Sequence, residues 1–90
     1  MPHKEIIALY HEVLPECARV VKWTKQRQGL LRARWKEEPK RQNLEWWRGY
    51  FEYVRESKFL MGDNGDFQAN LEWLIRPSNL LKVIEGQYHR

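Results

Sequence analysis

The chain has 90 residues, 42% of them hydrophobic, and a formal net charge of +4, which is enough material for one folded domain and too little for a second core. No apolar run is long enough to cross a bilayer and no signal peptide precedes the first expected helix, so we predict a cytoplasmic protein without membrane contact. Cys17 is the single cysteine, which excludes an internal disulfide and a cysteine-based zinc site and fits a reducing compartment.

The positive charge is concentrated in the middle of the chain. Residues 19–48 hold ten Lys or Arg against three Glu, a balance of +7, whereas residues 1–18 and 49–90 are each slightly acidic. A basic segment of this kind is typical of a protein that binds a polyanion, most often nucleic acid. The alternative is a solvated helix face that binds nothing.

Two helices are predicted before Pro39. Apolar residues recur at steps of three and four over residues 4–14, which indicates an amphipathic helix, and Pro15 ends it because the residue before a proline avoids helical backbone angles. A second helix is predicted over residues 24–38, with Thr24 as its N-cap.

The basic residues of this second helix divide between two faces. At 100° per residue, Lys25, Arg32 and Lys36 share a narrow outer stripe. Arg27 and Arg34 instead project among apolar residues, so we expect their stems to lie on the core and their guanidinium groups to pair with carboxylates.

A third helix, the centre of the domain, is predicted over residues 44–57 with Asn43 as its N-cap. Its apolar residues cover half of the circumference: Leu44, Trp46, Trp47, Tyr50, Phe51, Tyr53 and Val54. So wide a face packs either against two neighbouring elements or against one neighbour and an outside partner. In the second case Trp46, Tyr50 and Tyr53 form an exposed strip for protein interaction; in the first the whole face is core.

The remaining segments are shorter. An Asn-Gly pair between apolar runs indicates a β-hairpin or an exposed loop near residues 58–69. Asn70 is expected to cap a short helix over residues 71–75, and Ser78 to cap a last helix that ends at Gly86. The predicted fold is mainly α: one compact domain, residues 1–90, of four to five helices with an optional short hairpin.

The sequence does not favour an enzyme. His3, His11 and His89 lack the spacing of metal ligands, no glycine-rich phosphate loop or nucleophile elbow is present, and Cys17 is expected to be a structural thiol. We therefore predict no catalytic residue, no metal and no cofactor.

Nucleic-acid binding is better supported. Basic side chains on one helix face neutralise phosphates and release counterions, which gives salt-sensitive affinity with little sequence preference. Trp35 lies beside Arg32 and Lys36 and could stack on a base of a single strand, although it could equally be a core residue. The predicted nucleic-acid contacts are Lys22, Lys25, Arg32, Lys36, Lys40, Arg41 and Trp35.

Several stretches resemble the C-terminal module of temperate-phage and prophage replication proteins, of the replication initiator or replisome organiser type. They are Ile6–Pro15, Leu31–Trp35, Trp47-Arg48 with Phe51–Val54, Ser57–Gly62, Leu71–Leu74 and Asn79–Tyr88. The resemblance implies a module in a bacterial host cell that helps to recruit the replicative helicase or binds DNA as the origin opens. It also implies an upstream DNA-binding domain, so we expect this chain to be a fragment or a short stand-alone form.

Three interpretations follow. The first is a DNA-replication module that binds DNA, single-stranded or without strong sequence preference, through its basic second helix. The second is an adaptor that docks an acidic surface of the replicative helicase or another initiator without touching DNA, using the basic patch or the strip with Trp46, Tyr50 and Tyr53. The third is a homo-oligomer that buries this strip between copies.

Overall fold

The computed structural model describes residues 1–65 and 67–89, which form five α-helices, one 3-10 helix and no strand. The elements are α1 (His3–Val13), α2 (Lys25–Glu37), η1 (Pro39–Arg41), α3 (Leu44–Arg55), α4 (Leu71–Leu74) and α5 (Pro77–Ile84). The radius of gyration, 12.2 Å, is that of a single domain of this length. The prediction of one mainly α domain is confirmed.

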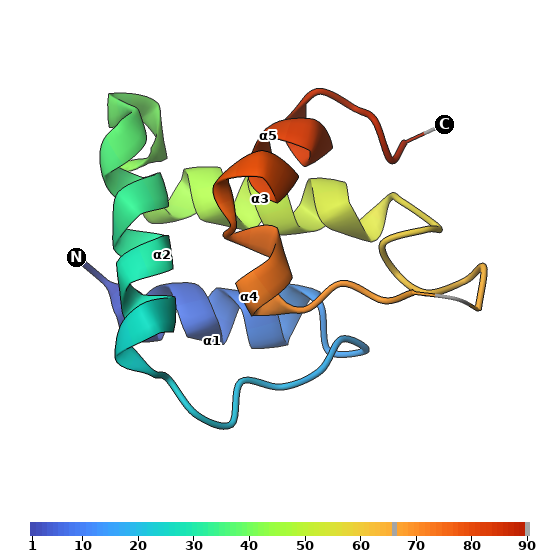
Figure 1. Cartoon of the computed structure of the whole chain (residues 1–90), viewed down its shortest axis with the longest axis horizontal. Coiled ribbons are helices and arrows are strands. Elements are labelled where there is room, and N and C mark those ends of the chain that lie inside the picture. Colours follow the sequence, from blue (N-terminus) through green and yellow to red (C-terminus); the bar gives the residue numbers. More distant parts are fainter. Residues whose placement is uncertain (66, 90) are drawn as a thin grey trace.

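Helices α1 and α3 lie side by side and run in the same direction, while α2 stands across their N-terminal ends (Figure 1). Two ion pairs join α3 to α1 and the turn that follows α1: Arg48 with Glu12 at 2.7 Å, and Arg55 with Glu16. The short helices α4 and α5 follow the loop after α3, and the Tyr50 hydroxyl donates to the Leu74 carbonyl at 2.7 Å, which fixes α4 against α3. The outer face of α2 is thereby left as one edge of the molecule.

The core is built around α3, as its wide apolar face predicts. Trp47, Phe51 and Val54 are fully buried, and Ile6 and Tyr10 of α1 are buried with them. Each buried aromatic side chain removes a large apolar area from water, which helps to stabilise so short a chain.

Three of the predicted N-caps are confirmed. The side chains of Thr24, Asn43 and Asn70 each accept the backbone N–H three residues on, at the start of α2, α3 and α4. The prediction for α5 is wrong: Pro77 is its first residue and Arg76, not Ser78, occupies the cap position without a side-chain hydrogen bond. A proline fits the first helical turn because its φ is already helical and it has no N–H to satisfy.

Residues 58–64 form turns and residues 67–69 are irregular, so the described residues do not form the optional β-hairpin; Asp66 lies outside the described residues. The backbone N–H of Met61 donates to the Ser57 carbonyl and that of Asp63 to the Lys58 carbonyl, and these bonds close successive turns after α3. One hydrogen bond, from the Ala69 N–H to the Leu60 carbonyl at 2.9 Å, stands where a hairpin would have a ladder. Hydrogen bonds between residues three to five apart therefore replace strand pairing in this segment.

Candidate functional site

Three basic side chains form a row along the outer face of α2, which we call the cation row: Lys25, Arg32 and Lys36. All three are exposed, and none has an ion pair with a carboxylate of the described residues. They lie seven and four residues apart, so they share a stripe about 16 Å long. The row therefore presents unneutralised positive charge to solvent, as the sequence predicts.

Gly29 lies within the cation row, one helical turn after Lys25, and was not identified from the sequence. A Cβ placed at Gly29 would meet no atom within 4 Å. The surface over the centre of the row is therefore open, and a partner can approach the helix backbone there. The four-residue step from Lys25 was the available signal.

The opposite face of α2 carries the arginines predicted to be internal. Arg27 donates from Nε to Glu72 at 2.8 Å. Arg34 is buried, donates from Nε to Glu37 at 3.0 Å, and donates from Nη1 to the Ile75 carbonyl at 3.0 Å. Both arginines connect α2 to the α4 region, and their charges are balanced by carboxylates of the same chain.

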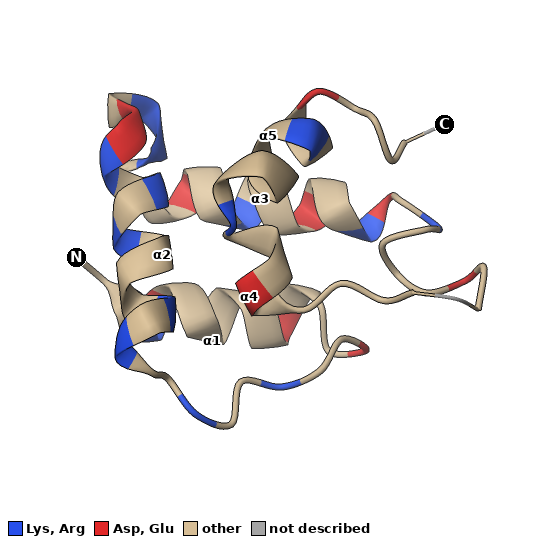
Figure 2. Ribbon diagram, in the orientation of Figure 1, with Lys and Arg blue, Asp and Glu red and all other residues tan. Residues whose placement is uncertain are grey.

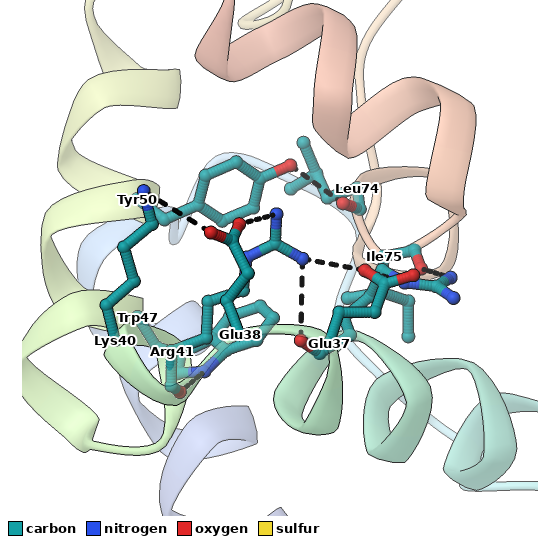
Figure 3. Close-up of polar contacts among 9 residues, drawn as sticks. Glu37, Glu38, Lys40, Arg41, Trp47, Tyr50, Leu74 and Ile75 are labelled. Atoms are coloured by element: carbon teal, nitrogen blue, oxygen red, sulfur yellow. Dashed lines mark hydrogen bonds and ion pairs between the residues drawn. The ribbon is translucent and has the colours of Figure 1, made fainter.

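The prediction that Arg41 contacts phosphate is wrong. Arg41 is only 4% exposed, and its guanidinium group pairs with Glu37 at 2.7 Å and Glu38 at 3.0 Å (Figure 3). The same group lies 5.3 Å from the ring centre of Trp46, and the Arg41 carbonyl accepts from the buried Trp47 indole at 2.9 Å. Arg41 thus holds η1 between α2 and α3 and has no surface to offer a phosphate.

Glu37, one of the two glutamates opposite Arg41, is held in its charged form by this arrangement. Partial burial alone would raise the pKa of Glu37, but hydrogen bonds and charge from Arg34 and Arg41 outweigh it and lower that pKa below its ordinary value. A carboxylate that accepts from two guanidinium groups is strongly favoured in its charged form.

The other predicted nucleic-acid contacts occupy intermediate positions. Lys40 is exposed but has Glu38 within 3.7 Å, which weakens its attraction for a phosphate. Lys22 is exposed in the segment before α2, where its carbonyl accepts from Arg27 at 2.8 Å. Trp35 is half-buried and packs against the core, so it is a supporting residue more than a free stacking platform.

The basic segment is therefore half neutralised. Figure 2 shows Lys and Arg along the whole of α2, but internal pairing removes the effect of four of the ten cations: Arg27, Arg34, Arg41 and Arg48. Five of the others have no ion pair with any described residue: Arg19, Lys22, Lys25, Arg32 and Lys36. The net charge available to a polyanion lies on α2 and the segment before it.

The strip predicted for protein interaction is partly core. Tyr50 is 4% exposed and its hydroxyl is bonded within the protein. Trp46 and Tyr53 are half-buried, and the Trp46 ring stacks on Tyr50 with centres 5.4 Å apart. Between α3 and α5 lies an open groove of about 350 Å³, which we call the α3–α5 groove; its lining is Glu45, Trp46, Gly49, Tyr50, Tyr53 and Ile84.

The titratable groups of the described residues do not gather into a metal site, since no three of His, Cys, Asp and Glu come together among them. Burial raises the pKa of the Cys17 thiol, with a further rise from Glu16, which lowers its nucleophilicity at neutral pH. Among the helices described, none has the length and apolar character needed to cross a membrane.

Comparisons with known proteins do not extend this description: no protein-family profile, no curated protein and no solved structure matches the chain.

Proposed function

We propose that this chain is a non-catalytic DNA-replication module that binds DNA through the cation row of α2. The row itself is the observation that supports this most directly. Its three cations are exposed, share one face and have no carboxylate partner in the described structure. Phosphates are the anions that a row of this length, about 16 Å, meets most readily along a nucleic-acid strand.

The composition of the row supports binding with little sequence preference. Gly29 and Ala33, which lie beside the cations on the exposed face, have no polar side-chain atoms. Sequence is read mainly by side-chain hydrogen bonds to base edges, whereas charge alone fixes a strand without reading it. The replication setting rests on the resemblance to temperate-phage replication proteins.

The test is the salt dependence of binding to a fluorescein-labelled oligonucleotide of 20 nucleotides, single-stranded in one arm and duplex in the other. Removal of two phosphate contacts in Lys25→Ala/Lys36→Ala reduces the slope of log affinity against log salt by roughly 1.4 for a single strand. The matched control is Lys58→Ala/Lys82→Ala, which removes the same charge from exposed lysines outside α2. An equal loss of slope in both double variants would show that net charge, and not the row, drives binding.

Gly29 offers a second test that deletes nothing. Because its Cβ position is open, Gly29→Lys and Gly29→Glu fit equally well on the helix and differ only in the sign of the added charge. We expect the first to tighten oligonucleotide binding and the second to weaken it, with the difference shrinking as salt rises. Equal affinities in low salt would contradict the proposal.

A further inference from the structure

Three acids without an ion pair in the described structure lie on α3 and at its C-terminal end. Glu45, Glu52 and Glu56 lie seven and four residues apart, so they share one stripe of this helix. All three are exposed, and none pairs with a basic residue of the described structure. We call these three residues the acidic stripe; Figure 2 shows acidic residues recurring along α3.

This acidic stripe borders the α3–α5 groove. Glu45 lines the groove, and Gly49 and Tyr53 connect the stripe to its floor. On the α5 side the lining residue is apolar: Ile84, which is 37% exposed. Lys82 is the one cation within α5.

The floor of the groove is aromatic and open at its centre. Trp46 and Tyr53 are half-buried there, and His89 stacks on Tyr53 with ring centres 3.7 Å apart, which covers one face of that ring. A Cβ at Gly49 would meet nothing within 4 Å. The groove thus has room for one inserted side chain, in contact with aromatic surface.

These features select the occupant by charge and shape. The acidic stripe would repel an acidic partner. The sequence predicts an acidic partner for the strip with Trp46, Tyr50 and Tyr53, whereas the structure favours a basic one. A second copy of the chain could offer its cation row, but Gly29 and Ala33 beside that row have no side chain long enough to fill the groove. The exposed Val21 in the basic segment before α2 reaches only to its Cγ atoms, which is short for a groove of about 350 Å³. A basic segment with an apolar anchor satisfies both the stripe and the floor.

We propose that the α3–α5 groove docks a basic segment of a partner protein through one aromatic or aliphatic side chain. The anchor lies against Trp46 and Tyr53, and flanking Lys or Arg residues pair with the acidic stripe. Because the groove and the cation row share no residue, the chain can hold a nucleic acid on α2 and a basic protein on α3. This second site does not depend on the proposed function.

The experiment is selection from a display library of random 12-residue peptides with the whole chain as bait. We expect the enriched peptides to carry a net positive charge and one large apolar residue. Their affinity falls about tenfold in Glu45→Gln/Glu52→Gln/Glu56→Gln, and by a similar factor in Gly49→Leu, which fills the groove. Gly29→Leu is the matched control, since it adds the same side chain at an equally open helix position on α2 and leaves peptide affinity unchanged.

Three results would overturn the proposal: no enrichment, enrichment of acidic or uncharged peptides, or equal binding to wild type and Gly49→Leu. Sedimentation of the chain alone adds a fourth, because a dimer that Gly49→Leu abolishes would show that a second copy occupies the groove. Oligonucleotide binding distinguishes this failure from failure of the proposed function: Gly49→Leu keeps the salt-dependent affinity, and Lys25→Ala/Lys36→Ala keeps the peptide affinity.

Discussion

Arg32 and Arg41 have the same side chain in one basic segment, and their surroundings give them different roles. Arg32 is exposed on the outer stripe of α2, where its guanidinium group is hydrated and free to meet an anion. Arg41 is buried against two glutamates and the Trp46 ring. A buried charge is tolerated only with partners in place, so Arg41 is committed to the fold.

The two arginines can be separated by experiment. Arg41→Ala leaves Glu37 with Arg34 as its only ion-pair partner and Glu38 with Lys40, and it removes the contacts that hold η1. We therefore expect a loss of about 2–3 kcal/mol in the free energy of unfolding. Arg32→Ala costs less than about 0.5 kcal/mol, as an exposed substitution. Urea denaturation measures both.

Oligonucleotide binding of the folded protein completes this comparison. We expect it to weaken for Arg32→Ala and to stay unchanged for Arg41→Ala. Stable Arg41→Ala protein, or unchanged binding in Arg32→Ala, would show that these roles are assigned to the wrong residues.

At the scale of elements, the helices begin and end through local devices. Thr24, Asn43 and Asn70 satisfy free N–H groups at three helix starts. Gly86, with φ of +79°, ends α5: its N–H donates to Val83 while the next N–H donates to Lys82. This pair of bonds requires a left-handed residue, which favours glycine.

Three Gly→Ala substitutions test this interpretation of the elements. Gly29→Ala and Gly49→Ala replace glycines inside helices where a Cβ meets nothing, so each should raise the free energy of unfolding by about 0.5–1 kcal/mol. Gly86→Ala should lower it by about 1 kcal/mol, because a side chain at positive φ is strained and its Cβ would lie 3.3 Å from the Tyr53 hydroxyl. Thermal unfolding followed by circular dichroism ranks the three variants. A stabilising Gly86→Ala would contradict the C-terminal motif.

At the scale of the whole molecule, charge is separated between two surfaces. The cation row lies on α2, and the acidic stripe lies on α3 and its C-terminal end. Between them, ion pairs such as Arg27 with Glu72 and Arg48 with Glu12 hold elements together. The charged groups that stabilise the fold therefore differ from those proposed to bind ligands. The pKa shifts of the first set predict how the stability of the fold changes with pH.

Acidification should destabilise the fold in two steps. Burial, aided by nearby positive charge, lowers the pKa of His3 and His11 below 6.5, so the unfolded chain takes up these protons first. Their contribution is full above pH 6.5 and is lost as pH falls below it. The second step belongs to Glu12, Glu16 and Glu72, whose pKa values are lowered by hydrogen bonds from arginines, that of Glu16 by Arg55 to about 2. Their contribution is full above pH 4.5 and disappears towards pH 2.

Urea unfolding between pH 8 and pH 3 measures this profile. The His11 Nε2 accepts the Val20 N–H at 3.0 Å, a bond that protonation of the ring abolishes. The upper step should therefore shrink in His11→Gln, while the lower step stays. A free energy of unfolding that is flat from pH 7 to pH 5 would contradict the role assigned to the histidines.

The sequence by itself determined the five helices, three of their N-caps, the outer stripe of α2 and the internal fate of Arg27 and Arg34, because helical period and capping act over three or four residues. Glu37 and Arg41 also stand four residues apart, a spacing that favours an ion pair within one helix. Pro39 lies between them and ends the predicted helix, so the sequence does not predict this pair. The tertiary structure alone decided that η1 brings Arg41 to Glu37, that residues 58–64 form turns, and that an aromatic groove opens between α3 and α5. These outcomes depend on contacts between residues far apart in the chain, such as Arg34 with the Ile75 carbonyl, which no local pattern records.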